Sequence, residues 1–505
     1  MLAGAGAMSV QDRETGDVGG PPDDREAGGD GGPADAREPA SARERPARRP
    51  RRGRLTALLA AAALVTAAAV ATALTVAPRN HAPETTRTAP SPTLAPASTA
   101  ASTAAAPGAG PAVNDAVDAV LRTATAAVVK HRLDAYLSTF DPSNADLLAH
   151  ERQVFANLMM LPLGGFSLAR NWEHDAQPAS RSRALPAGAV VVRTLLSYRL
   201  AGDWDTRDML EQLPLTLAPT PHGWKIVSDA DDPAVSDAVS WRTEPWWGSA
   251  IAVVATSRVL VIGSAGQDRA LHRLSRQVEA LLPLVRARWP EESWNGHVVA
   301  YGITDPAFVR AWFGDRAAGA GRQGVVAEVA PVGQLPRVVV TPYLLGTDDP
   351  DTSAYLTHEI THVATQDVGR EVPRWLTEGV AEYTAYRAGG RSVDGAASWA
   401  RYPRSRPLRA ALAHGSLDLI MDAGRFYAGP DEAVDLAYAQ GWLGCLYIAH
   451  RYGDVMLRRV LDLMAAQPDT YPLPEAEDRT LRELLHLDTA QFTAAARAYG
   501  LSLAR

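Results

Sequence analysis

The residue pattern with the clearest chemical meaning is HEITH, from His358 to His362. On a helix, residues four positions apart lie on one face, one turn apart, so His358 and His362 could bind one zinc ion together. Glu359 lies between them, where its carboxylate could reach a water molecule bound to that metal. The alternative is a chance match, in which two histidines and a glutamate merely share a helix face.

A catalytic zinc site needs a third protein ligand and one open position for water. The single cysteine, Cys445, excludes a thiolate cage, so any metal must be held by His, Glu or Asp. The segment that follows the histidines offers two carboxylates one helical turn apart, Glu378 and Glu382. Pro373, just before them, suits the start of a helix.

Two motifs together resemble those of the gluzincin metallopeptidases, particularly the peptidase MA-like family and, more distantly, the M1 aminopeptidases. They are HEITH at 358–362 and WLTEGVAEY at 375–383. The resemblance implies a thermolysin-like zinc peptidase domain over residues 250–500, ending in a helical C-terminal lobe. Its expected substrate is a peptide or protein.

The resemblance also implies how the site is built. Glu378 matches the third ligand, so that His358, His362 and Glu378 would hold one zinc ion per chain. Fifteen residues separate His362 from Glu378, fewer than in those families, and spacing alone would select Glu382 instead. Zinc lowers the pKa of a bound water towards ~7, and Glu359 would take its proton as the hydroxide attacks a carbonyl.

Tyr438 is the candidate for stabilising the oxyanion that such an attack produces. Residues 438–442, YAQGW, resemble the M1 motif that contains this tyrosine, although Gln440 replaces the usual lysine. A core tyrosine on a helix over 436–452 is the alternative. The M1 motif that holds a free amino terminus is absent, so an endopeptidase is expected rather than an aminopeptidase. Gluzincins bind peptide along an edge strand before the metal helix, here expected at 337–342.

Residues 113–235 show the pattern of a separate α+β unit. Apolar residues repeat at helical spacing from Val113, and strand-like segments follow, the last of them at 222–229. This order resembles the NTF2-like cone fold, in which the cone can hold a ligand, act catalytically or dock a partner. No acid/base pair here is spaced for catalysis, so a ligand or a protein partner is the expected role.

The first 112 residues lack the pattern of a folded domain. Residues 1–54 contain almost no large apolar side chains, which predicts a disordered tail. Residues 55–77 carry no charge and follow a cluster of arginines, which predicts a single transmembrane helix with a cytoplasmic N terminus. Residues 78–112, rich in Ala, Thr, Pro and Ser, predict an extended stalk. A cleaved secretory signal or a twin-arginine signal is the alternative.

Length and composition limit the number of domains and the classes of partner. The 505 residues suggest roughly two to three domains, and the net charge of −7 comes with mixed signs and no basic stripe for nucleic acid. The expected protein is an α+β zinc metallopeptidase, anchored in the cell membrane by one helix, with its catalytic domain outside the cytoplasm. The alternative is a cell-surface binding or docking protein with a structural or vestigial zinc site. The presence of Glu359 argues against this alternative, because a purely structural zinc site needs no base between the histidines.

Overall fold

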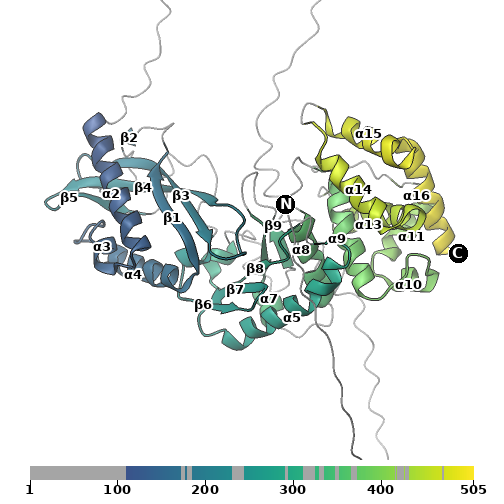
Figure 1. Ribbon diagram of the computed structural model, residues 1–505, viewed down its shortest axis with the longest axis horizontal. Helices are drawn as coiled ribbons and strands as arrows, with labels where there is room; N and C mark the ends of the chain where they lie inside the picture. Colours follow the sequence, from purple (N-terminus) through teal and green to yellow (C-terminus); the bar gives the residue numbers. More distant parts are fainter. Residues whose placement is uncertain are drawn as a thin grey trace, which may run out of the picture. The chain divides into compact units, whose positions relative to one another are not determined.

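The computed structural model describes residues 110–171, 177–178, 185–229, 244–290, 294–310, 325–328, 335–346, 352–365, 372–415, 417, 426, 431–468 and 471–505. These residues form an α+β structure (Figure 1). The predicted tail at 1–54, the predicted span at 55–77 and nearly all of the predicted stalk lie outside the described residues.

The single transmembrane helix is the part of the expected fold class that the structure does not support. Among the residues that the structure describes, no helix is long and apolar enough to cross a membrane. The prediction rests on the length and lack of charge of residues 55–77 and on the arginines before them, but the segment is rich in alanine, which buries little apolar area per residue. The fold class that the structure supports is therefore α+β, without the predicted membrane helix.

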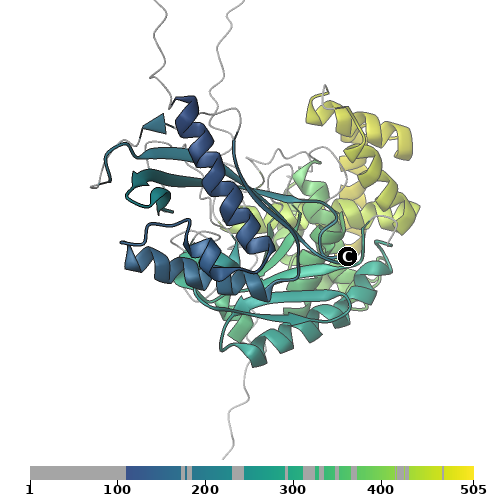
Figure 2. The same ribbon diagram turned by 60° about the vertical axis from the view of Figure 1, so that its left-hand side comes forward.

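The first part of the described chain is a curved antiparallel sheet with helices packed against it (Figures 1 and 2). Its elements are α2 (Pro111–Val129), α3 (Leu133–Leu137), α4 (Ala145–Met160), β1 (Leu163–Arg170), β2 (Gln177–Pro178), β3 (Val190–Leu200), β4 (Met209–Thr220) and β5 (Gly223–Ser228). The strand order is β1-β3-β4-β5, with β2 beside β3. Val117 and Leu121 of α2 share a core with Val192 and Leu196 of β3, so the sheet and its helices form one half-barrel module.

The next part is a mixed five-stranded sheet with the order β6-β7-β8-β10-β9. Its elements, with the short helix before it, are η1 (Pro245–Trp247), β6 (Ile251–Ala255), β7 (Val259–Ser264), α5 (Asp268–Arg286), β8 (Val298–Gly302), β9 (Val325–Glu328) and β10 (Arg337–Val340). The expectation that 337–342 forms an edge strand is wrong, because β10 lies between β8 and β9 and β9 forms the edge. Sequence order cannot reveal this, since a late strand can join the sheet beside any earlier one.

Side chains of this sheet alternate between two buried faces, as in other sheets covered on both sides. On β7, Val259 and Val261 pack in the core that includes α5, whereas Leu260 and Ile262 pack in the core of the half-barrel module. β8 and β10 follow the same alternation. The half-barrel module therefore covers one face of the sheet, and helices cover the other.

The rest of the chain is helical and includes the two motifs. Its elements are α7 (Pro342–Gly346), α8 (Thr352–Thr365), α9 (Arg374–Ala388), α10 (Ala396–Arg401), α11 (Ser405–His414), α13 (Asp431–Tyr452), α14 (Asp454–Ala465), α15 (Leu473–Leu485) and α16 (Thr489–Ala504). The helices predicted for both motifs are confirmed as α8 and α9. Their neighbour α13 passes close to α9, with its glycines at the contact.

Glycine makes the close approach of α9 and α13 possible. A Cβ atom on Gly379 would lie 2.5 Å from the carbonyl oxygen of Gly441. A Cβ atom on Gly441 would lie 2.5 Å from the carbonyl oxygen of Trp375. Real Cβ atoms do not approach backbone so closely, so both positions need glycine for the helices to pack at this distance.

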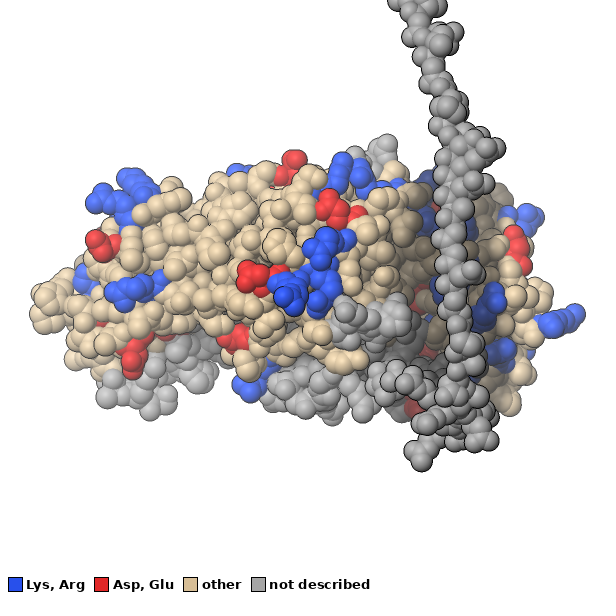
Figure 3. Space-filling model, turned by 90° about the horizontal axis from the view of Figure 1, so that it is seen from below, with Lys and Arg blue, Asp and Glu red and all other residues tan. Residues whose placement is uncertain are grey.

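Charges of both signs are mixed on the face that Figure 3 shows. Among the described residues on this face, Lys and Arg side chains lie among Asp and Glu side chains and form no continuous basic stripe (Figure 3).

Candidate metal centre

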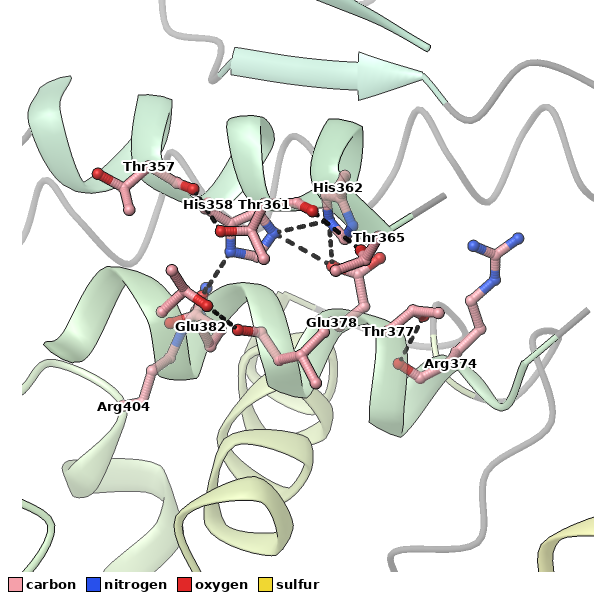
Figure 4. A network of polar contacts seen from close by, with 12 residues as sticks. Thr357, His358, Thr361, His362, Thr365, Arg374, Thr377, Glu378, Glu382 and Arg404 are labelled. Carbon is pink, nitrogen blue, oxygen red and sulfur yellow. Dashed lines mark hydrogen bonds and ion pairs between the residues drawn. The ribbon is translucent and has the colours of Figure 1, made fainter. Parts of the chain in front are cut away.

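The helix α8 is buried from Tyr355 to Thr365, so its polar side chains need hydrogen-bond partners inside the protein. The hydroxyl groups of Thr357, Thr361 and Thr365 each donate to the backbone carbonyl four residues earlier. Leu356 and Ile360 pack in the core beneath the second sheet. The imidazoles of His358 and His362 point from α8 toward α9 (Figure 4).

Three ligand atoms meet between α8 and α9. The Nε2 atoms of His358 and His362 lie 3.1 Å apart. Oε2 of Glu378 lies 3.2 Å from Nε2 of His358 and 3.3 Å from Nε2 of His362 (Figure 4). Zinc binds such atoms at about 2.0–2.2 Å, and tetrahedral ligands at this distance lie about 3.3–3.6 Å from one another. The triangle therefore fits one ion after movements of a few tenths of an ångström.

Glu359 lies beside this triangle. One of its carboxylate oxygens and one ring nitrogen from each histidine all lie within 4.8 Å of one another. Glu378 approaches the same nitrogens more closely, at 3.2 and 3.3 Å. Glu378 is therefore better placed than Glu359 to complete a ligand set with the two histidines, and Glu359 is a candidate for contacting a water molecule beside them.

Glu382 lies on the opposite side of His358 from Glu378. Its Oε1 atom is 3.7 Å from Nδ1 of His358, within ion-pair range but beyond a hydrogen bond. A carboxylate in this position can orient a ligand histidine from behind. Glu382 therefore does not face the triangle, although spacing alone selected it as a ligand.

Tyr402 and Arg404 hold the carboxylate of Glu382 in place. The hydroxyl of Tyr402 donates to Oε2, and the guanidinium of Arg404 donates to Oε1 through Nε at 3.3 Å and Nη2 at 3.1 Å. Arg404 also donates to Asp435 on α13. Sequence reasoning missed these partners, because no motif connects them with α9.

Burial and neighbouring charges shift the protonation of this site strongly. Burial alone would raise the pKa of Glu378, but His362 and His358 overcome it by charge and hydrogen bonding and hold that pKa well below its ordinary range. Burial would lower the pKa of His358, but the hydrogen bond with Glu378 and the charges of Glu359 and Glu382 raise it to about 9. Without a metal, the site therefore favours a proton on His358 beside an ionised Glu378.

Tyr438 lies next to the metal triangle. The centroid of its ring is 6.1 Å from that of His358, and Phe426 packs against it with centroids 5.2 Å apart. The Cζ atom of Arg404 lies 4.8 Å from the centroid of the same ring. The structure thus brings all five residues singled out in the sequence, His358, Glu359, His362, Glu378 and Tyr438, into one cluster.

A second group of possible ligands lies in the half-barrel module. His150, Glu151 and Asp229 each place one such atom within 4.8 Å of the others. Nε2 of His150 lies 3.3 Å from Oδ2 of Asp229, and the Tyr136 hydroxyl donates to Glu151 at 2.6 Å. An ion pair and a hydrogen bond account for this grouping, and we assign no metal to it.

No protein-family model matches this chain, and no curated protein matches its sequence. The likeness to gluzincins therefore rests on the residues of the two motifs.

Proposed function

We propose that this protein is a zinc-dependent hydrolase that cleaves peptide bonds. The observation that carries the proposal is the triangle of His358, His362 and Glu378, whose ligand atoms lie 3.1–3.3 Å apart. Two imidazoles and a carboxylate form the ligand set of zinc hydrolases that keep one position open for water. Glu359, a base beside that position, distinguishes such a site from a purely structural one.

When bound, zinc would polarise the substrate carbonyl and lower the pKa of water at the open position. Glu359 takes one proton from the attacking water as its oxygen bonds to the carbonyl carbon. Glu359 then passes this proton to the nitrogen of the amide as the C–N bond breaks, so that an acid and an amine result. Tyr438, beside His358, would donate a hydrogen bond to the oxyanion that forms between these steps.

A peptide is the substrate that the neighbouring backbone suits best. Among the described strands, β9 forms the edge of the second sheet, and it contacts α8, which contains both histidines. An edge strand presents unpaired amide and carbonyl groups, to which an extended peptide can pair as a further strand. A peptide in that position would run past the metal triangle with its backbone held by β9.

Metal analysis of the full chain tests the proposal directly. We expect about one zinc per chain and its loss in His358→Ala, since two remaining ligands bind zinc poorly. An unstructured protein serves as the substrate, because its backbone is accessible for pairing with β9. A full chain that takes up no zinc would contradict the proposal, and so would a zinc-loaded chain that cleaves no peptide bond. The latter result would instead favour a binding protein with a structural metal.

A further inference from the structure

Arg404 is a buried cation close to the metal triangle. It directly precedes α11, and its side chain is only 2% exposed. A guanidinium removed from water is costly unless carboxylates or other acceptors surround it. The partners of Arg404 therefore indicate how its charge is stabilised inside the protein and which residues it holds in place.

The partners of Arg404 come from two other helices. Its Nε and Nη2 groups donate to Glu382 on α9, and its Nη1 group donates to Asp435 on α13. The charges of these carboxylates raise the pKa of Arg404 despite its burial, so it stays positively charged. A planar guanidinium can bridge two carboxylates at fixed angles, which a lysine ammonium cannot do.

The same guanidinium also lies over the ring of Tyr438, with Cζ 4.8 Å from the ring centroid. Tyr438 and Asp435 are three residues apart on α13, so they lie on one face of that helix. Arg404 therefore contacts α13 twice on the side that faces His358, once through Asp435 and once through Tyr438.

We propose that Arg404 is a positioning residue that couples the metal ligand His358 to Tyr438. It fixes Glu382 behind Nδ1 of His358, and it fixes Tyr438 beside the same imidazole. This inference rests on the proposed zinc hydrolase. It adds that both the metal affinity and the placement of the tyrosine depend on one guanidinium that would touch neither metal nor substrate.

The test compares Arg404→Lys with Arg409→Lys in the full chain. Arg409 is the matched control, because it lies on α11, is exposed and stacks on Trp399 with its Cζ 5.6 Å from the ring. We expect Arg404→Lys to weaken zinc binding about 10- to 100-fold, as loss of a contact behind a ligand does. Arg409→Lys should bind zinc like the parent. Zinc affinity is measured by competition with a chelator.

A double-mutant cycle between Arg404 and Glu382 distinguishes a positioning role from a general effect on stability. If Arg404 acts through Glu382, then Glu382→Gln and Arg404→Lys weaken zinc binding by similar factors, and the double variant is little worse than either. Tyr402→Phe removes one hydrogen bond to Glu382 and should weaken zinc binding in the same direction by a smaller factor. This variant keeps the test decisive if Arg404→Lys does not fold.

The outcomes distinguish this inference from the proposed function. A parent chain that binds zinc and hydrolyses peptide, with unchanged zinc affinity in both Arg404→Lys and Tyr402→Phe, would overturn the inference and leave the proposed function standing. A lower melting temperature with unchanged zinc affinity would also overturn it, because the role would then be structural only. A parent chain that takes up no zinc would overturn both.

Discussion

The guanidinium of Arg337 on β10 donates to the carboxylate of Asp205 in the half-barrel module at 2.7 Å, and both side chains are almost fully buried. Glu244 lies in the same cluster and accepts hydrogen bonds from Tyr198 of β3 and Tyr301 of β8. Burial raises the pKa of Glu244, although Arg337 and the two tyrosine hydroxyls oppose that shift. The half-barrel and the second sheet are thus joined by a polar cluster inside a shared apolar core.

Removing Asp205 should destabilise the fold strongly. Asp205→Ala leaves Arg337 buried without its carboxylate, and loss of one partner of a buried ion pair costs about 3–5 kcal/mol. Replacing both partners, as in Asp205→Leu with Arg337→Met, should cost less because neither member of the ion pair is left without the other. Urea unfolding of the full chain measures both changes. Losses in Asp205→Leu and Arg337→Met alone that add up to the loss in the double variant would show that the pair is not coupled.

A chain that lacks the half-barrel module, residues 110–229, should not fold into a soluble domain. The deletion would expose the apolar side chains of the sheet that face this module, namely Leu260, Ile262, Val299 and Val339. An apolar patch of this kind promotes aggregation. Size-exclusion chromatography and circular dichroism of the shortened chain check this outcome. A monomeric, folded product would show that the two parts are independent.

Glutamine substitutions should separate the roles of Glu378 and Glu382. Glu378→Gln removes a charged ligand atom that lies 3.2–3.3 Å from both Nε2 atoms, so zinc binding should fall by more than about 100-fold. Glu382→Gln weakens only the contact behind His358, and we expect a loss of about 10- to 100-fold. Chelator competition gives both affinities. If the order of the two losses were reversed, Glu382 would be the ligand.

Glu359→Gln should retain zinc and lose hydrolysis. An amide cannot accept the proton of the attacking water, and general bases typically contribute about 10²- to 10⁴-fold to a rate. Tyr438→Phe should also retain zinc and lower kcat, by about 10²- to 10³-fold if its hydroxyl stabilises the oxyanion. Zinc content and kcat are measured on the same preparations. Parental rates in Glu359→Gln would exclude it as the base.

Zinc binding and the stability of the metal-free protein should change in opposite directions with pH. The pKa of His358 is raised from 6.5 to about 9, so its proton stabilises the metal-free fold fully below pH 6.5 and is lost as the pH rises through about 9. Zinc must displace that proton, so its affinity should increase over the same range. Thermal unfolding of metal-free parent and His358→Asn across this range, with zinc titrations of the parent, tests both trends. If the stability of the metal-free parent followed the same pH profile as that of His358→Asn, the predicted loss of stability with rising pH would be contradicted.

The part of the site that sequence reasoning could predict is the part whose residues lie on a single helix. His358, Glu359 and His362 share one helix, and helical geometry alone places both imidazoles on one face. Helix geometry could not decide between Glu378 and Glu382, because both lie on one face of α9 and both are buried, and only the motif resemblance favoured Glu378. Only the position of α9 against α8 and α13 directs Glu378 at the triangle and Glu382 at the back of His358.

The sequence alone therefore determined the local arrangement: a helix with two imidazoles and a carboxylate beside them, and a second helix with two carboxylates. Tertiary structure decided the rest. It put β10 inside the sheet and β9 at its edge, buried the sheet against the half-barrel module, and brought Arg404 to Glu382. The physical reason is that residue spacing fixes geometry only within an element. Distances between elements depend on how side chains pack, and packing is a property of the whole core.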